Sequence, residues 1–183
     1  MSDRDFVYKM KASVFVGTSL DGFIARVDGA FDFLPAGGGE PHGYEEFMAS
    51  VDALVIGRKT YEVVLSMGGW HYGKKPVFVL SSKDLVPSPA GAVVERMSGD
   101  PSEIVSQLAA RGFEHAYVDG GQTIQEFLRA GFVSRLIITR VPVLIGTGIS
   151  LFGPVSRDIA LKHTTTRQFA SGLVQSEYEV VAP

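Results

Sequence analysis

A repeated alternation of short apolar runs with amphipathic segments is the feature that most constrains the fold of this chain. The apolar runs lie at 13–17, 53–56, 76–80 and 116–118. Each run ends at or just before a glycine or a small polar residue, and a segment with helical spacing follows the second and the fourth. Repeated strand–helix units of this kind predict a largely parallel sheet that helices cover on both faces.

Helical signals are clear in four places. Over 44–51, apolar side chains recur at i, i+3, i+4 and i+7, which is one face of a helix. Asp100-Pro101-Ser102-Glu103 is a strong helix start, because Asp can cap, Pro suits the first helical position and Glu completes the capping box. We expect the other two helices from Arg58 to about Met67, and after Gly120-Gly121 with Gly131 beyond the helix end.

The C-terminal part has a different pattern. Strand-like runs at 160–170 and 173–181 are joined by Ser171-Gly172, which predicts a β-hairpin. Further strands are expected at 92–95 and 135–143. Because no repeat or linker divides residues 1–183, we expect one α/β domain whose mostly parallel sheet ends in an antiparallel hairpin.

Composition excludes several function classes. The chain has 183 residues, a net charge of −3 and no long basic run, which argues against nucleic-acid binding. It has no window of about eighteen apolar residues, so we expect no membrane span. It has no cysteine, and its four histidines lack metal-ligand spacing, so we expect no metal. The N-terminus lacks the apolar core of a signal peptide, and we expect a cytoplasmic protein.

Three strand ends carry residues suited to phosphate binding. Gly57-Arg58-Lys59-Thr60 and Gly120-Gly121-Gln122-Thr123 each begin a predicted helix, where free N–H groups and the helix dipole favour anions. Ser81 and Ser82 follow a third strand. Ligands of open α/β sheets bind beyond the carboxyl ends of the strands, so the three positions together favour a dinucleotide. Simple capping or turn formation explains each position taken alone.

Five segments, in this order, resemble proteins of the dihydrofolate-reductase fold. The resemblance is greatest to the C-terminal reductase domain of the bifunctional riboflavin-biosynthesis deaminase-reductase and to its stand-alone bacterial relatives, and it covers about residues 11–181. The segments are TSLDGFIA (18–25), ALVIGRKTYE (53–62), VFVLSS (77–82), VDGGQTIQEFL (118–128) and RLIITRVPVLIGTGISLF (135–152). The resemblance implies a dihydrofolate-reductase-like three-layer sandwich.

The resemblance also implies that the chain binds NADPH. In the family, the residue that matches Arg58 meets the adenosine 2′-phosphate and the one that matches Thr60 meets the pyrophosphate region. An always-charged guanidinium fork suits a phosphate, which favours NADPH over NADH. By the same resemblance, the remaining cofactor contacts fall on Ser81 and Ser82 beside the adenosine, on Gly120, Gly121, Gln122 and Thr123 beside the pyrophosphate, and on Gly17 beside the nicotinamide.

Carboxylates near the expected substrate side are the candidate catalytic residues. Asp21 matches an acidic residue that faces the substrate's ribose in riboflavin-type reductases, although a turn residue before Gly22 is an equal alternative. Glu45 and Glu46 lie on the helix where classical dihydrofolate reductases carry a carboxylate, but a solvated helix face explains them as well. Leu20 and Trp70 are expected to line the substrate cleft.

The expected activity is an NADPH-dependent reduction. The cofactor would deliver a hydride to an electron-poor carbon of a small heterocyclic or pentose-bearing substrate, and a ribosylamino-pyrimidine of the riboflavin pathway is one option. Two alternatives stay open: dihydrofolate reductase activity and a non-catalytic NADPH-binding protein. We expect a homodimer formed through the late strands, because relatives often pair.

Overall fold

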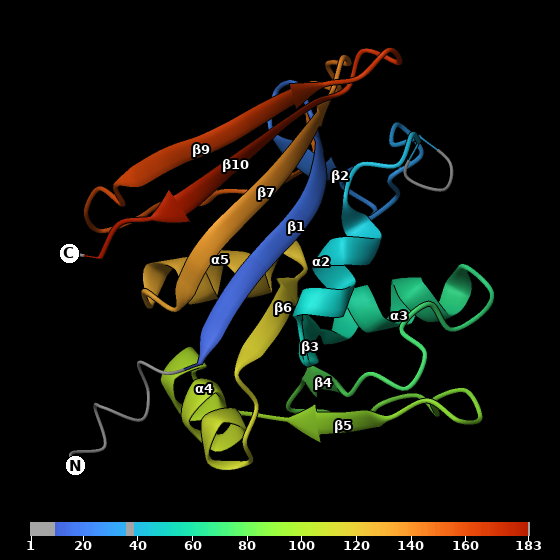
Figure 1. Cartoon of the computed structure of the whole chain (residues 1–183). Coiled ribbons are helices and arrows are strands. Elements are labelled where there is room, and N and C mark those ends of the chain that lie inside the picture. Colours follow the sequence, from blue (N-terminus) through green and yellow to red (C-terminus); the bar gives the residue numbers. More distant parts are fainter. Residues whose placement is uncertain (1–9, 36–38, 183) are drawn as a thin grey trace.

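A single eight-stranded sheet forms the centre of the molecule (Figure 1). The computed structural model describes residues 10–35 and 39–182. The strand order is β5-β4-β3-β6-β1-β7-β10-β9. From β5 to β7 all neighbours are parallel, and β10 and β9 add two antiparallel pairings at one edge. The strands are β1 (Lys11–Ser19), β3 (Ala53–Gly57), β4 (Val77–Leu80), β5 (Val94–Met97), β6 (His115–Asp119), β7 (Val133–Val141), β9 (Leu161–Gln168) and β10 (Val174–Val180).

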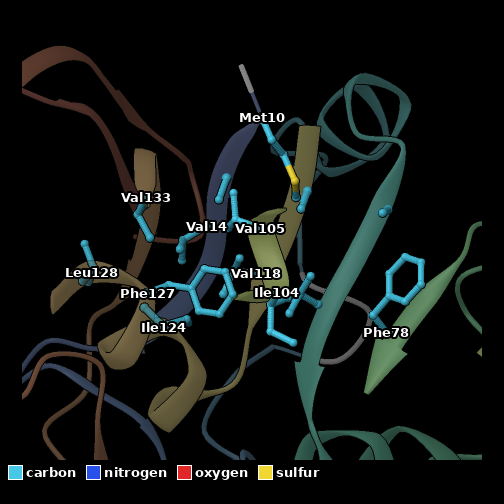
Figure 2. Close-up of a cluster of buried hydrophobic side chains, with 14 of the residues drawn as sticks. Met10, Val14, Phe78, Ile104, Val105, Val118, Ile124, Phe127, Leu128 and Val133 are labelled. Atoms are coloured by element: carbon cyan, nitrogen blue, oxygen red, sulfur yellow. The ribbon is translucent and has the colours of Figure 1, made fainter. Parts of the chain in front are cut away.

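Helices cover both faces of this sheet, as the sequence predicts. One layer contains α2 (Tyr44–Ser50) and α3 (Arg58–Ser66), and the other contains α4 (Pro101–Ala110) and α5 (Gly121–Arg129). Each layer has its own buried cluster. Ile104 of α4 and Phe127 of α5 are fully buried against the sheet on one face (Figure 2), and Phe47 of α2 and Tyr61 of α3 are buried on the other. The predicted three-layer arrangement is confirmed.

The predicted helix start at Asp100 is confirmed in atomic detail. The carboxylate of Asp100 accepts a hydrogen bond from the Glu103 N–H at 3.0 Å, and the Glu103 carboxylate accepts one from the Asp100 N–H at 2.9 Å. Both N–H groups lie at a helix end and have no partner within the helix, so this capping box fixes where α4 begins.

Three details of the strands differ from expectation. β7 spans Val133–Val141, two positions earlier than the expected 135–143. β5 begins at Val94, two positions later than the apolar run at 92–95, because pairing of Val77 with Val94 sets its register. A second, two-stranded sheet was not expected: β2 (Phe23–Ala25) pairs antiparallel with β8 (Ile149–Ser150). This small sheet joins the loop after β1 to the loop after β7. No helix among the described residues is long and apolar enough to cross a membrane.

Candidate cofactor and substrate cleft

The central strands β1 and β6 separate toward their carboxyl ends. They pair only from Lys11 to Ser13, whereas β1 pairs with β7 up to Ser19. The last residues of β6 stay paired with β3, up to Asp119 opposite Ile56. The hydroxyl of Tyr117 donates a hydrogen bond of 2.8 Å to the carbonyl of Phe15 and so bridges the two strands where they part. The strands separate at the end of the sheet where the predicted phosphate-binding junctions lie, which is where open α/β sheets bind ligands, and we call this place the candidate cleft.

The N-termini of α3 and α5 interlock beside this cleft. The side chain of Thr60 fills the space next to Gly120, where a Cβ atom would collide with it. On the opposite side, a Cβ at Gly57 would lie 3.0 Å from Oγ1 of Thr123. Each helix thus places a threonine against the glycine that precedes the other helix. Two sets of free N–H groups are therefore brought to one place, as a single phosphate-bearing ligand requires.

Only a glycine suits the turn between β6 and α5. Gly120 has φ of 96°, in the left-handed region where a side chain is strained. Gly121 is buried, and a Cβ there would lie 2.9 Å from Ile24 and 3.0 Å from Ile149. The small β2–β8 sheet therefore packs directly on the start of α5, and the two glycines let all these segments approach closely.

The polar residues predicted to bind the cofactor have the following places. Arg58 is half-buried and forms an ion pair with Glu62, one turn along α3. Ser81 closes a turn, since its hydroxyl donates to the Lys83 carbonyl at 2.7 Å and accepts from the Lys83 N–H at 3.0 Å. Exposed residues of this set are Lys59, Ser82 and Gln122. Their cofactor contacts stay predictions.

A carboxyl that the sequence did not single out lies at the end of β6. Oδ1 of Asp119 accepts a hydrogen bond of 2.8 Å from the Gly120 N–H. Burial raises the pKa of Asp119, although the hydrogen bond from the Gly120 N–H acts in the opposite direction. A carboxyl with a raised pKa at a cleft is a candidate proton donor.

The charge of Asp119 acts on three tyrosines. Burial, and next the charge of Asp119, raise the pKa of Tyr44 on α2 to about 12. The same two causes raise the pKa of Tyr72, which lies in the loop after α3, and that of Tyr117 on β6. The hydroxyls therefore stay neutral, so Asp119 is the acidic group of this cluster. A signal for it exists in the sequence: an aspartate that ends a buried strand directly before a glycine pair.

Asp21 connects the loops after β1 and β7. Its carboxylate accepts hydrogen bonds from the N–H groups of Ile145 at 3.3 Å and Gly146 at 2.8 Å. The Ser19 side chain is the first cause that lowers the pKa of Asp21, and these backbone bonds contribute too. Asp21 is exposed and therefore holds its charge. The structure gives it a clear role in holding the 145–146 loop, and its catalytic role stays a prediction.

The other residues predicted to meet the substrate are placed less centrally. Glu45 and Glu46 are exposed on the first turn of α2. Leu20 is exposed after β1. Trp70 donates a hydrogen bond from Nε1 to the Gly73 carbonyl at 3.0 Å, which holds its own loop. These substrate-side roles stay predictions.

Gly17 lies in the cleft and is covered by the loop that follows. A Cβ at Gly17 would lie 3.0 Å from the Leu34 side chain, so the absence of a side chain lets that loop approach β1. Its predicted contact with a nicotinamide ring stays a prediction. Among the described residues, no group of three or more acidic or histidine side chains is arranged to hold a metal ion.

Comparison with known proteins identifies the family. Residues 11–175 match the model of the RibD C-terminal domain. The chain belongs to this family. A solved Shewanella protein, described as "Putative riboflavin biosynthesis protein", is 36% identical, with a TM-score of 0.86 over 94% of this chain and 100% of its own.

More distant solved structures confirm the fold. A Thermotoga maritima deaminase and 5-amino-6-(5-phosphoribosylamino)uracil reductase is 16% identical, with a TM-score of 0.73 over 95% of this chain and 57% of its own. Dihydrofolate reductase from Enterococcus faecalis, solved with NADP(H), is 15% identical, with a TM-score of 0.62 over 94% of this chain and 96% of its own. The RibD C-terminal domain and dihydrofolate reductase therefore share this fold, and the predicted resemblance is confirmed.

Proposed function

We propose that this protein is an NADPH-dependent reductase that acts on a small heterocyclic or pentose-bearing substrate. The observation that carries the proposal is the interlocking of Thr60 with Gly120 and of Thr123 with Gly57. This arrangement presents the N–H groups of two helix ends at one point. A pyrophosphate carries enough oxygen acceptors to use both ends at once.

The residues around this point fit NADPH. The α3 and α5 N-termini would hold the pyrophosphate, and Arg58 at the start of α3 would pair with the adenosine 2′-phosphate. Arg58 already binds the carboxylate of Glu62, so its guanidinium is held in place before the cofactor arrives. NADH has no 2′-phosphate and so gains no contact with Arg58, whereas NADPH does. This difference favours NADPH over NADH.

Asp119 is the proposed proton donor. The bound cofactor supplies a hydride, and the reduced substrate then needs one proton on the atom beside the new C–H bond. The raised pKa of Asp119 keeps its carboxyl protonated to higher pH than an exposed aspartate. Oδ1 is taken by the Gly120 N–H, which leaves Oδ2 to deliver the proton. Burial of this carboxyl holds its pKa up, because the charged form loses its contact with water.

A ribosylamino-pyrimidine is the proposed substrate type, on the strength of family membership and of the Thermotoga neighbour's named reductase activity. The experiment is an assay of NADPH oxidation with 5-amino-6-(5-phosphoribosylamino)uracil, in parallel with dihydrofolate. We expect turnover with the pyrimidine. Asp119→Asn should lower kcat by roughly 10²–10⁴-fold, the usual contribution of a positioned acid.

Carboxylate variants identify the proton donor. Asp21→Asn, Glu45→Gln and Glu46→Gln test the other candidates, and Asp158→Asn is a matched change at an exposed carboxyl away from the cleft. A loss confined to one of the first three would move the role from Asp119 to that residue. Turnover with dihydrofolate alone would support the dihydrofolate alternative, and NADPH binding without turnover on either substrate would support a non-catalytic protein.

We also propose a cytoplasmic homodimer that pairs through the late strands. The supporting observation is that β9, at the edge of the sheet, is exposed along its whole length. An exposed edge strand is a surface that proteins commonly cover. Light scattering coupled to size-exclusion chromatography should give twice the mass of one 19.7 kDa chain. The mass of a single chain would contradict the dimer.

A further inference from the structure

A row of side chains crosses four strands on the face that carries α2. In the sheet register, Gly17 of β1 lies opposite Thr139 of β7, Thr139 lies opposite Gln175 of β10, and Gln175 lies opposite Arg167 of β9. The row therefore runs from the cleft at Gly17 to the outer edge of the sheet. Residues of the C-terminal hairpin, which takes no part in the proposed cofactor site, thus share a row with the cleft.

The polar members of this row are joined by hydrogen bonds. Gln175 is buried, and its Nε2 donates to Oγ1 of Thr139 at 3.0 Å. Its Oε1 accepts a bond of 2.5 Å from Nη2 of Arg167. Since an arginine can only donate, the amide orientation is determined: oxygen toward Arg167 and nitrogen toward Thr139.

Both hairpin side chains also bind one carbonyl of the loop before α2. The carbonyl oxygen of His42 accepts bonds from Nη2 of Arg167 at 2.9 Å and from Nε2 of Gln175 at 3.0 Å. A third contact holds the same loop, since the Glu40 carboxylate accepts a bond of 2.8 Å from the Ser171 N–H. The segment 40–43 is thus tied to the hairpin at residues far away in sequence.

The imidazole of His42 is held against the buried ring of Phe15 as a result. Its ring centroid is 5.4 Å from that of Phe15, whose carbonyl marks the point where β1 and β6 part. Nδ1 lies 2.8 Å from the Glu40 carbonyl, which can only accept, so Nδ1 carries the proton in the neutral ring. This tautomer leaves Nε2 as a hydrogen-bond acceptor. Tyr44, one of the tyrosines around Asp119, follows two residues later.

We propose that Gln175 and Arg167 are positioning residues that hold His42 at the substrate side of the cleft, where its Nε2 accepts a hydrogen bond from the N–H edge of a heterocyclic substrate. We call the bonds from Gln175 and Arg167 to the His42 carbonyl the clamp. The substrate in this inference rests on the proposed function, but the clamp does not. Two donors on one carbonyl fix the peptide of His42, and the bond to Glu40 fixes the ring. The substrate class follows from the acceptor: a ring or amino group that carries N–H donors.

The first test is spectroscopic and needs no substrate. Long-range ¹H–¹⁵N spectra of the histidine rings, recorded on the full chain with NADPH, should show His42 as the Nδ1–H tautomer, with its signals assigned from His42→Asn. Gln175→Leu and Arg167→Met should shift these signals toward an average of both tautomers. Lys162→Met is the matched control. It also removes a cation from β9, but Lys162 pairs with Glu179 and not with the loop of His42.

The second test is kinetic, with 5-amino-6-(5-phosphoribosylamino)uracil as the probe. Arg167→Met and Gln175→Leu should each raise KM by about tenfold, the scale of one lost hydrogen bond to a fixed partner. The dissociation constant of NADPH should change less than twofold. Arg167→Lys keeps one donor and should recover most of the wild-type KM. Arg167 is exposed in the single chain, so its variants test the proposal even if Gln175→Leu fails to fold, and light scattering of each variant checks that the oligomeric state is that of the wild type.

The two tests separate the failure of this inference from the failure of the proposed function. Absence of turnover in the wild type would contradict the proposed substrate and leave the tautomer test intact. An unchanged His42 spectrum in both variants would overturn the clamp. An equal rise of KM in Lys162→Met would overturn it too, because the effect would then belong to the hairpin as a whole.

Discussion

The side chain of Thr60 occupies the space that Gly120 leaves by having no side chain. Thr60 lies on the first turn of α3 and Gly120 directly before α5, so this one contact joins two helix ends from distant parts of the sequence. Its counterpart, Thr123 against Gly57, makes the joint reciprocal. The proposed cofactor site depends on this joint, because it brings the free N–H groups of both helices together.

Gly120→Ala should destabilise the protein more than a glycine change in open space. Gly131 is the matched control, with φ of 78° and nothing near its missing side chain, so Gly131→Ala costs only the left-handed strain of about 1–2 kcal/mol. Gly120→Ala adds a collision with Thr60, on the order of 1–3 kcal/mol more. Urea unfolding of both variants measures the difference.

The double variant Gly120→Ala with Thr60→Ala tests whether the collision is the cause. Removing the Thr60 hydroxyl and methyl should recover the part of the unfolding free energy that the collision costs. The cost of an alanine at a positive φ should remain. Equal unfolding free energies for Gly120→Ala and Gly131→Ala would mean that the helix ends adjust freely. That result would contradict a tight contact between Thr60 and Gly120.

Asp119→Asn should stabilise the protein at neutral pH while it lowers kcat. A folded-state pKa above that of the unfolded chain means that the folded protein binds the proton more tightly. Stability from this group is therefore full below the unfolded pKa of about 3.9 and is lost as pH rises through the folded pKa. Asparagine carries no charge to bury, and each kcal/mol gained should raise Tm by about 2–4 °C.

Calorimetry at pH 7 to 8 measures this gain, with Asp158→Asn as the matched control at an exposed site. A lower Tm for Asp119→Asn would show that its ionised form is well solvated in the fold. In that case the carboxyl would be ionised at neutral pH and unsuited to donate a proton.

His115 should make stability fall in mild acid. Burial is the main cause that lowers its pKa in the folded state, against an unfolded value of about 6.5. Nε2 lies 2.7 Å from the buried hydroxyl of Ser13, and Nδ1 lies 2.9 Å from the Ser50 carbonyl. Between the two pKa values the unfolded chain binds more protons, so stability is full above about pH 6.5 and falls as pH is lowered below it.

The measurement is Tm against pH in wild type, His115→Gln and His71→Gln. His71 is exposed in the loop after α3, away from β9, and serves as the control. The slope just below pH 6.5 should be smaller in His115→Gln and unchanged in His71→Gln. If the same slope remains in His115→Gln, groups other than His115 cause the fall of Tm below pH 6.5.

Periodicity predicts most of the layers because it follows from burial. The spacing at 44–51 identifies α2, since a helix on a sheet must bury one stripe of side chains. The Ser171-Gly172 turn identifies the β9–β10 hairpin, since the register of a hairpin is set locally. The start of β5 is misplaced, because pairing with β4 fixes it and no pattern within the strand contains that information.

The cleft is predicted only in part, for a related physical reason. Arg58, Thr60 and the Gly120-Gly121 pair stand out because helix ends have a local signature in sequence. Asp119 does not stand out, because its environment is built by tyrosines from three separate segments. The bonds from Gln175 and Arg167 to His42 span more than a hundred positions and arise only in the folded sheet.

Cofactor affinity tests the central claim most directly. Titration calorimetry should compare NADPH with NADH on wild type, Arg58→Ala and Glu62→Gln, the last of which releases the Arg58 guanidinium. We predict that wild type binds NADPH at least tenfold more tightly than NADH, that Arg58→Ala removes this preference, and that Glu62→Gln keeps it, because a charge-assisted phosphate contact contributes about 1.5–3 kcal/mol. Equal affinity for both nucleotides in all three proteins, or no binding at all, would contradict the account.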